Sequence, residues 1–336
     1  EPSISDDQKT EALTAYADIV LASYEDSYTT VEALKVALQA LVDAPSETTL
    51  EAAKTAWLAA REPYGQTEVY RFYNGPIDNE ADGVEGNMNA WPLDEAWIDY
   101  VEGDLTAGIV NDPSITIDAA TLRAKNEEDG VETNVATGYH ALEFLLWGQD
   151  NDDPSAQTAG ARPASDFDTA DNADRRKAYL MVCVDLLLED LAFVRDSWAE
   201  GASYRSSYVG GGDESLASIL TGMGSLSKAE LAGERMKVAL VNADQEDEHS
   251  CFADNTDRDI VTNALGIQNV FNGVYVRVNG STISGTSLAS LVAILNPELS
   301  TRMVSDLVAS VSACQAINDP FDLEISAGNT EGNARV

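Results

Sequence analysis

The chain has 336 residues, and its 58 Asp and Glu against 20 Lys and Arg give a formal net charge of -38. This charge repels phosphate backbones and anionic lipid surfaces, so it argues against nucleic-acid and membrane-surface binding and favours a cationic ligand or a saline environment. The length suffices for two domains with sizeable cores, and no apolar run approaches the roughly 20 residues that a membrane span needs.

The start of the chain predicts helices. Ser5, Thr29 and Thr48 are each followed three residues later by Gln or Glu, the spacing of a capping box, which predicts three opening helices. Apolar residues recur in them at three-to-four spacing, as expected for one buried stripe per helix. The pattern is that of a helical bundle.

The next part of the chain is more irregular. Pro63 and the turn-like residues 74–78 predict a long excursion over 64–100. A helix is expected from about 133 to 147, and the polar stretch 148–173 is the expected linker between domains.

The second half of the chain is also predicted to be mostly helical. The expected elements are helices near 173–198, 214–241, 256–272 and 286–317, with a small β-hairpin at 274–280. The predicted fold class is therefore all-α, with an N-terminal bundle domain (1–155), a C-terminal bundle domain (165–336) and a hairpin insertion. Each half carries one histidine, which suggests an ancient duplication.

The two histidines, His140 and His249, are the strongest candidates for metal or proton chemistry, because a neutral imidazole is a favoured metal ligand. On the expected helix, His140 and Glu143 share a face at i and i+3. The zinc-protease motifs need a second histidine nearby, which is missing here, so a metal at this pair would recruit His249. Two imidazoles and a carboxylate suit iron or zinc, and further carboxylates favour ferric iron.

Acidic residues surround His249. Glu246, Glu248 and Asp254 are candidates for ligands or supporting groups. The alternative is a solvated acidic loop without a ligand.

The three cysteines show no CxxC spacing, which argues against a thiolate zinc site. We expect one disulfide, between Cys251 and Cys314, and one free thiol at Cys183.

Two further sets of charged residues are candidate supports. Glu68 and Arg71 stand at i and i+3 among tyrosines, where they would orient the ligands or simply belong to an aromatic core. Arg235, near a helix end, would grip a carboxylate or siderophore anion.

Three strings in order resemble the imelysin family, and within it the branch called imelysin-like or iron-regulated protein A. They are Gly-Tyr-His-Ala-Leu-Glu-Phe-Leu-Leu-Trp-Gly-Gln-Asp at 138–150, Arg-Phe-Tyr-Asn-Gly-Pro-Ile-Asp at 71–78, and Gly-Glu-Arg-Met at 233–236 leading to Glu-His-Ser-Cys-Phe-Ala-Asp-Asn-Thr at 248–256. The resemblance spans most of the chain. It implies two helical bundles with the site near their interface, and His140 and Glu143 as metal ligands.

The resemblance also implies a location and a role. It implies export to the periplasm or outer membrane surface of a bacterium, often through a lipid anchor upstream of Glu1, and a link to cell-envelope iron-uptake proteins. Our first hypothesis is a protein that binds iron or an iron-bearing small ligand.

Two alternatives remain open. Related proteins are called insulin-cleaving metalloproteases, so the second hypothesis is a metallopeptidase, with Glu143 or Glu248 as the base. The third is binding of haem, with His140 as an axial ligand, or of another organic ligand, with the His-x-x-Glu pair as a structural element.

Overall fold

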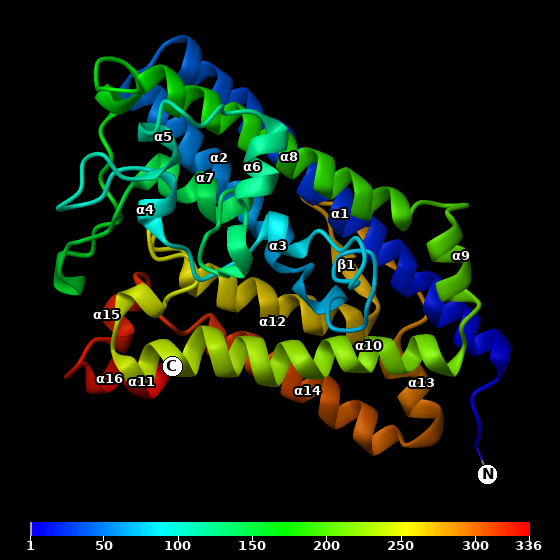
Figure 1. The fold of residues 1–336 in the computed structure, drawn as a ribbon. Helices are drawn as coiled ribbons and strands as arrows, with labels where there is room; N and C mark the ends of the chain where they lie inside the picture. Colours follow the sequence, from blue (N-terminus) through cyan, green and yellow to red (C-terminus); the bar gives the residue numbers. More distant parts are fainter. Residues whose placement is uncertain (1) are drawn as a thin grey trace.

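The computed structural model describes residues 2–336 and shows an almost entirely helical protein (Figure 1). The long helices are α1 (Asp6–Asp43), α2 (Glu47–Gly65), α8 (Ala173–Ser197), α10 (Asp213–Ser225), α12 (Thr256–Asn272) and α14 (Pro297–Cys314). The shorter ones are α3 (Glu85–Met88), α4 (Glu95–Ile98), α5 (Gly108–Asn111), α6 (Ala119–Lys125), α7 (Gly138–Trp147), α9 (Ser203–Val209), α11 (Ala239–Asn242), α13 (Leu288–Leu295), α15 (Phe321–Ile325) and α16 (Thr330–Arg335).

Other regular segments are brief. The 3-10 turns are η1 (Glu68–Tyr70), η2 (Glu128–Gly130), η3 (Pro154–Ala156), η4 (Ala164–Phe167) and η6 (Gln245–Asp247), and η5 (Leu226–Val238) is a π-helix. Strands β1 (Val274–Val276) and β2 (Thr282–Ser284) pair antiparallel, with Val274 opposite Ser284. The predicted all-α class with a small hairpin is confirmed.

The chain opens with two helices rather than the predicted three. The Ser5 capping box is present, with the Ser5 hydroxyl accepting from the Gln8 N–H. Helix α1 then continues through Thr29, because its buried stripe goes on through Val31, Leu34, Leu38 and Leu41 and this burial outweighs a local cap signal.

The second helix also begins earlier than predicted. Ser46, not Thr48, is its N-cap, with a reciprocal capping box to Thr49. Pro63 lies in its last turns, and α2 ends only at Gly65.

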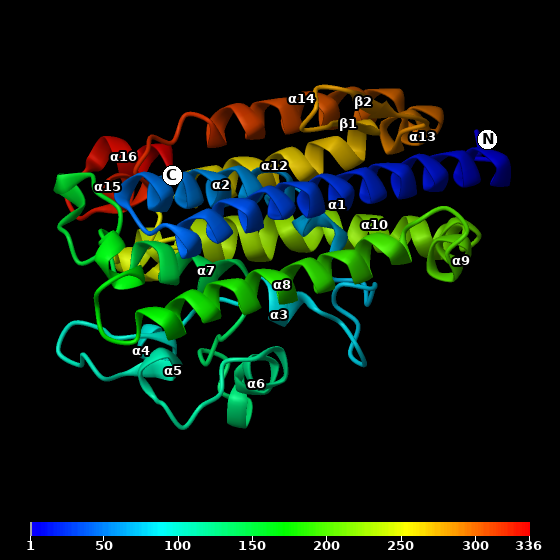
Figure 2. The same cartoon turned by 90° about the horizontal axis from the view of Figure 1, so that it is seen from above.

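The long helices lie side by side (Figure 2). Helix α8 packs on α1 and α7, whereas α12 packs on α2 and α14. The excursion that carries α3 to α6 lies beyond α8. One continuous apolar core includes residues from both halves of the chain, and the division into domains 1–155 and 165–336 stays a prediction.

The predicted helix near 214–241 is one continuous rod, formed by α10, η5 and α11. Its middle is π-helical, a wide and rare form that the sequence pattern does not predict. The predicted helix at 286–317 is divided into α13 and α14, because Asn296 caps a new helix at Pro297.

Two further expectations concern cysteines and membranes. Cys183, Cys251 and Cys314 are all free, buried thiols, so the predicted pairing of Cys251 with Cys314 is not formed. Burial raises the pKa of both of these thiols and keeps them protonated, as in ordinary core residues. None of the helices in residues 2–336 combines the length and the apolarity that a membrane crossing requires.

Candidate functional site

Helix α7 places the His-x-x-Glu pair in the core. The helix begins at Gly138, whose φ of +87° and close approach to the Met88 carbonyl exclude a side chain. His140 Nδ1 lies 2.8 Å from Glu143 Oε2, and both side chains are fully buried. Glu143 Oε1 accepts a hydrogen bond from the Ala253 N–H. Glu143 therefore already has partners for both of its oxygens.

His249, in the segment before α12, has a carboxylate partner of its own. Its Nδ1 lies 2.7 Å from Asp259 Oδ2, which also accepts from the Ser250 hydroxyl. Asp259 Oδ1 accepts from Arg61 Nη2 at 2.9 Å. Burial acts to raise the pKa of Asp259, but the charge of Arg61 and the hydrogen bonds from His249 and Ser250 outweigh it and hold this pKa well below its usual range. Asp259 is ionised, so His249 donates from Nδ1 and its Nε2 carries the lone pair.

The two imidazoles meet. Their ring centroids are 4.7 Å apart, and the Trp91 ring lies 5.0 Å from His140 and 6.5 Å from His249. His140 Nε2 is buried without a hydrogen-bond partner, and His249 Nε2 is 3.5 Å from Arg235 Nη2. Each histidine thus has Nδ1 held by a carboxyl group and Nε2 turned elsewhere, which is the arrangement that orients a metal-binding imidazole.

Burial and nearby positive charge keep both rings neutral. Burial, then the proximity of the His249 ring and the charge of Arg61, lowers the pKa of His140 well below its usual value. Burial, then the charge of Arg235, lowers the pKa of His249 to about 4. A neutral imidazole is the form that binds a metal.

Glu68 joins the second group of predicted residues. Its Oε2 accepts from Arg71 Nη1 at 2.8 Å and from Arg235 Nη2 at 3.0 Å. Its Oε1 accepts from the Asn89 amide at 3.0 Å, and Asn89 Oδ1 accepts from Arg61 Nη1 at 2.6 Å. Burial would raise the pKa of Glu68, but the charges of Arg71 and Arg235 lower it on balance, so Glu68 is ionised.

These contacts close into a ring of hydrogen-bonded side chains. In order, it consists of His249, Asp259, Arg61, Asn89, Glu68 and Arg235. All six side chains are buried. Such a network fixes the position of each member before a ligand arrives.

A cavity of about 510 Å³ opens next to this ring. His249, Arg235, Arg71, Asn89 and Trp91 line it, whereas His140 and Glu143 do not, and the His140 ring packs against Trp91 and His249. The cavity is also lined by acidic residues from both halves of the chain, among them Glu85, Glu127, Glu230, Glu234, Glu246 and Asp247. It therefore presents an inner wall with imidazole and guanidinium groups and many carboxylates around it.

The remaining predicted residues lie elsewhere. Glu246 lines the cavity, but Glu248 and Asp254 do not. Within residues 2–336, the one set of three potential metal-ligand residues whose atoms lie within 4.8 Å of one another is Asp150, Asp254 and Asp322. His140, Glu143 and His249 do not form such a set, and their role as joint metal ligands stays a prediction.

Sequence reasoning missed four members of the site. Arg61, Asn89, Trp91 and Asp259 were not singled out, although Arg61 opens the aromatic segment that contains Glu68. A buried arginine is a signal for a buried carboxylate, but its partner here is 198 residues away. Local spacing cannot identify such a pair.

Comparisons with known proteins agree on the family. The family model described as Imelysin, peptidase M75, matches residues 20–336. Iron-regulated protein A of Synechococcus elongatus is 25% identical over 321 residues, which cover 92% of this chain and 76% of that protein.

Two solved structures share the fold. One is described as an iron-regulated protein A precursor from Parabacteroides distasonis, with a TM-score of 0.73, 21% identity and coverage of 99% of this chain and 91% of that one. The other is an imelysin-like protein from Psychrobacter arcticum, with a TM-score of 0.66, 16% identity and the same coverage. From the family model and the shared fold, we conclude that this chain belongs to the imelysin family.

Proposed function

We propose that this protein is an exported bacterial iron-binding protein, with its site where the two histidines meet the cavity of about 510 Å³. The observation that carries the proposal is the pairing of His140 and His249, with ring centroids 4.7 Å apart and a carboxylate at each Nδ1. The name of the Synechococcus relative, iron-regulated protein A, supports a role linked to iron.

The residues present fit a metal ion. His140 Nε2 is a buried nitrogen without a partner, and His249 Nε2 lies at the cavity wall. These two atoms would hold the metal, and Glu230 and Glu246 would supply the oxygen ligands that suit ferric iron. In this arrangement Glu143 orients His140 rather than binding the metal directly.

Arg235 determines the form in which iron would bind. Its guanidinium lies 3.5 Å from His249 Nε2, so it repels a bare cation there. The same guanidinium attracts a carboxylate-bearing iron chelate, because arginine pairs well with carboxylates. The proposal therefore favours an anionic iron-bearing small ligand over a free ion.

The test is a titration of the chelator-treated protein with ferrous iron, zinc and ferric citrate, at a salt concentration high enough to suppress nonspecific binding. Saturable binding of iron is expected in the wild type, with a loss of at least tenfold in affinity in His140→Ala, Glu143→Ala and His249→Ala. Glu51→Gln, an exposed change on α2, is the control for lost surface charge. Binding that is equal in all four variants would contradict the proposal.

A fifth variant separates the two forms of iron. Arg235→Gln is expected to weaken the binding of ferric citrate and to strengthen that of ferrous iron. The opposite result would show that a bare ion is the ligand.

The geometry favours binding over peptide hydrolysis, although the family model carries a peptidase name. A metallopeptidase needs a base within reach of a metal-bound water. Glu143 is fully buried, and both of its oxygens have partners. Chelator-sensitive cleavage of an unfolded peptide that disappears in Glu143→Ala would reverse this preference, and a Soret band on titration with haem would favour the haem alternative.

We also propose a location in the bacterial envelope, beside iron-uptake proteins. The word precursor in the description of the Parabacteroides structure supports it, since a precursor carries a segment that is later removed. Fractionation of bacteria that express the full gene tests it: recovery of the protein from the periplasm or outer membrane is expected, and recovery from the cytosol alone would contradict it.

A further inference from the structure

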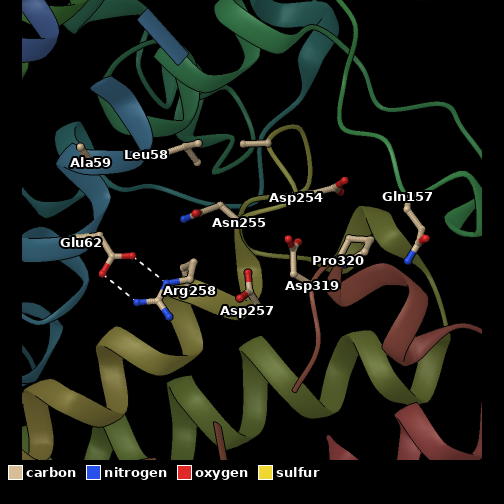
Figure 3. Close-up of a pocket in the computed structure, with 11 residues that line it drawn as sticks. Leu58, Ala59, Glu62, Gln157, Asp254, Asn255, Asp257, Arg258, Asp319 and Pro320 are labelled. Carbon is tan, nitrogen blue, oxygen red and sulfur yellow. Dashed lines mark hydrogen bonds and ion pairs between the residues drawn. The ribbon is translucent and has the colours of Figure 1, made fainter. Parts of the chain in front are cut away.

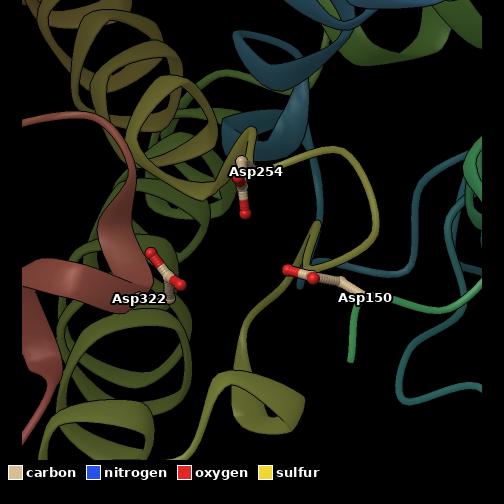
Figure 4. Close-up of side chains that lie close together, drawn as sticks. All are labelled: Asp150, Asp254 and Asp322. Atoms are coloured by element: carbon tan, nitrogen blue, oxygen red, sulfur yellow. The ribbon is translucent and has the colours of Figure 1, made fainter. Parts of the chain in front are cut away.

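A second group of carboxylates lies apart from the histidines. Asp150 follows α7, Asp254 precedes α12 and Asp322 belongs to α15, and one oxygen of each lies within 4.8 Å of the others (Figure 4). Asp150 and Asp322 are only 5% and 4% exposed. Three segments that are distant in the sequence thus bring their carboxylates close together, although these like charges repel one another.

Glu248 provides an independent indication of a missing partner. Its side chain is 1% exposed, and neither carboxylate oxygen has a hydrogen bond. The negative charges of Asp322, Asp254 and Asp150 all act on it, so its carboxylate lies within their electrostatic range. The Thr256 hydroxyl, which accepts a hydrogen bond from the Ser250 N–H, is near enough to lower the pKa of Glu248, but it forms no hydrogen bond with either carboxylate oxygen. A buried carboxylate without a donor is rare in a folded protein, because the desolvation is uncompensated.

No positive side chain neutralises this group in the part of the chain that the structure describes. The charges that act on Asp150, Glu248, Asp254 and Asp322 come from other carboxylates, and no lysine or arginine is among them. Asp259, by contrast, forms an ion pair with Arg61. At the aspartate group the protein supplies negative charge but no positive side chain to balance it.

One member of the group, Asp254, is accessible from a solvent-filled cavity. A cavity of about 640 Å³ is lined by Asp254 together with Asp257, Asp319, Gln157 and Arg258 (Figure 3). In Figure 3, Arg258 is held by Glu62 on the far side from Asp254. An ion can therefore reach Asp254 through an acidic passage.

We propose that Asp150, Asp254 and Asp322 form a binding site for a calcium ion, with the buried, unpartnered Glu248 beside it adding negative charge. These carboxylates offer hard oxygen atoms, which suit Ca²⁺, whereas zinc favours the nitrogen and sulfur ligands that this group lacks. Mg²⁺ demands a small, regular octahedron and retains its waters, so it fits a set of carboxylates from three separate segments less well. The ion joins the C-terminal helix α15 to the segments after α7 and before α12.

This site is separate from the proposed iron site. Glu248 and His249 are neighbours in the sequence, but His249 contacts Asp259 and Trp91 while Glu248 has the three aspartates around it. The two sites can therefore be tested independently.

The experiment measures the thermal unfolding of the chelator-treated full chain with added Ca²⁺ or Mg²⁺ at high salt. We expect a saturable rise in Tm with Ca²⁺ and a much weaker response to Mg²⁺. In Asp322→Asn, the rise should be lost, while the Tm without Ca²⁺ should equal or exceed that of the wild type, since one repulsive charge is removed. Asp306→Asn, on the outer surface of α14, is the matched control and should respond like the wild type.

Two further variants make the result decisive. Glu248→Gln should raise the Ca²⁺ concentration needed for the increase in Tm by at least tenfold. This variant takes the place of Asp322→Asn if the latter does not fold. His140→Ala should retain the full response, because it leaves the aspartates intact. A wild type without a Ca²⁺ response, an equal response to Mg²⁺, or equal responses of Glu248→Gln and Asp306→Asn would each overturn the proposal.

Discussion

Two acidic groups to which the segment 248–259 contributes differ in how their charges are compensated. Asp259 and Glu68 have arginine partners, which keep the pKa of each carboxyl below its usual value although both are buried. Burial and then the charges of neighbouring carboxylates raise the pKa of Asp254 to about 7 and that of Asp322 to about 6. The difference teaches that burial alone does not decide the ionisation of a carboxyl: one group has its counter-charges within the protein, whereas the other has repelled charges that the proposed cation would balance.

The largest expected effect follows from breaking the compensated group. Arg61→Met should lower the free energy of unfolding by roughly 3 to 5 kcal/mol, because it leaves Asp259 buried without its main counter-charge. Denaturant unfolding at neutral pH measures it. Arg258→Met removes a comparable pair with Glu62 at the surface, and it should change stability by less than about 1 kcal/mol. Equal losses in the two variants would show that burial does not distinguish these pairs.

The next effect concerns two Asp→Asn substitutions that should change the free energy of unfolding in opposite directions. Asp259→Asn should destabilise the calcium-free protein by about 2 to 3 kcal/mol, because Arg61 and His249 lose an ionised partner. Asp254→Asn should stabilise it by about 1 kcal/mol at pH 8, because it removes a repelled charge. The positive φ of Asp254, 53°, suits asparagine equally well, so backbone strain does not obscure the comparison. Denaturant unfolding in the presence of a chelator checks both, and changes of the same sign would contradict the distinction.

The smallest expected effect is a pH dependence at Asp257, which lines the acidic passage. Burial, and then the charge of Asp319, raises its pKa from 3.8 to about 6. The folded protein therefore binds more protons than the unfolded chain between these values, so this group lowers the free energy of unfolding as pH rises from about 4 to 6. Asp257→Asn does not lose this stability. The difference in free energy of unfolding between the variant and the wild type should therefore rise by about 1 kcal/mol from about pH 4 to about pH 6, a value reduced from the full pKa shift because Asp257 is partly exposed. Paired unfolding curves at several pH values measure it, and a difference that is constant with pH would argue against the raised pKa.

Much of the fold follows from local patterns in the sequence. The period of the apolar residues predicts the helices, and the alternation before Asn279 and Gly280 predicts the hairpin. The length of α1 cannot be predicted from these local patterns, because a continuous buried surface outweighs the cap signal at Thr29. The π-helix does not follow either, since its hydrogen-bond register leaves no distinct apolar period in the sequence.

The site is partly predictable for a similar reason. The contact of His140 with Glu143 follows from helical spacing, and that of Glu68 with Arg71 from the same i and i+3 separation. The separation of Glu248 from His249 cannot be read from the sequence, because adjacent side chains outside a helix point in different directions. The partner of Arg61 depends on how two distant helices pack, and only the folded structure specifies it.

The ring of hydrogen-bonded side chains has a consequence for the folding of the chain. It closes only when α2, η1, the α3 segment, η5 and the start of α12 have all come together, and two of its contacts, Arg61 with Asp259 and Glu68 with Arg235, span 198 and 167 residues. Contacts of this kind form late, because the entropy of closing long loops must first be overcome. A nascent or partly folded chain therefore has the two histidines but not the preorganised pair, and binding at this site would report on completed folding.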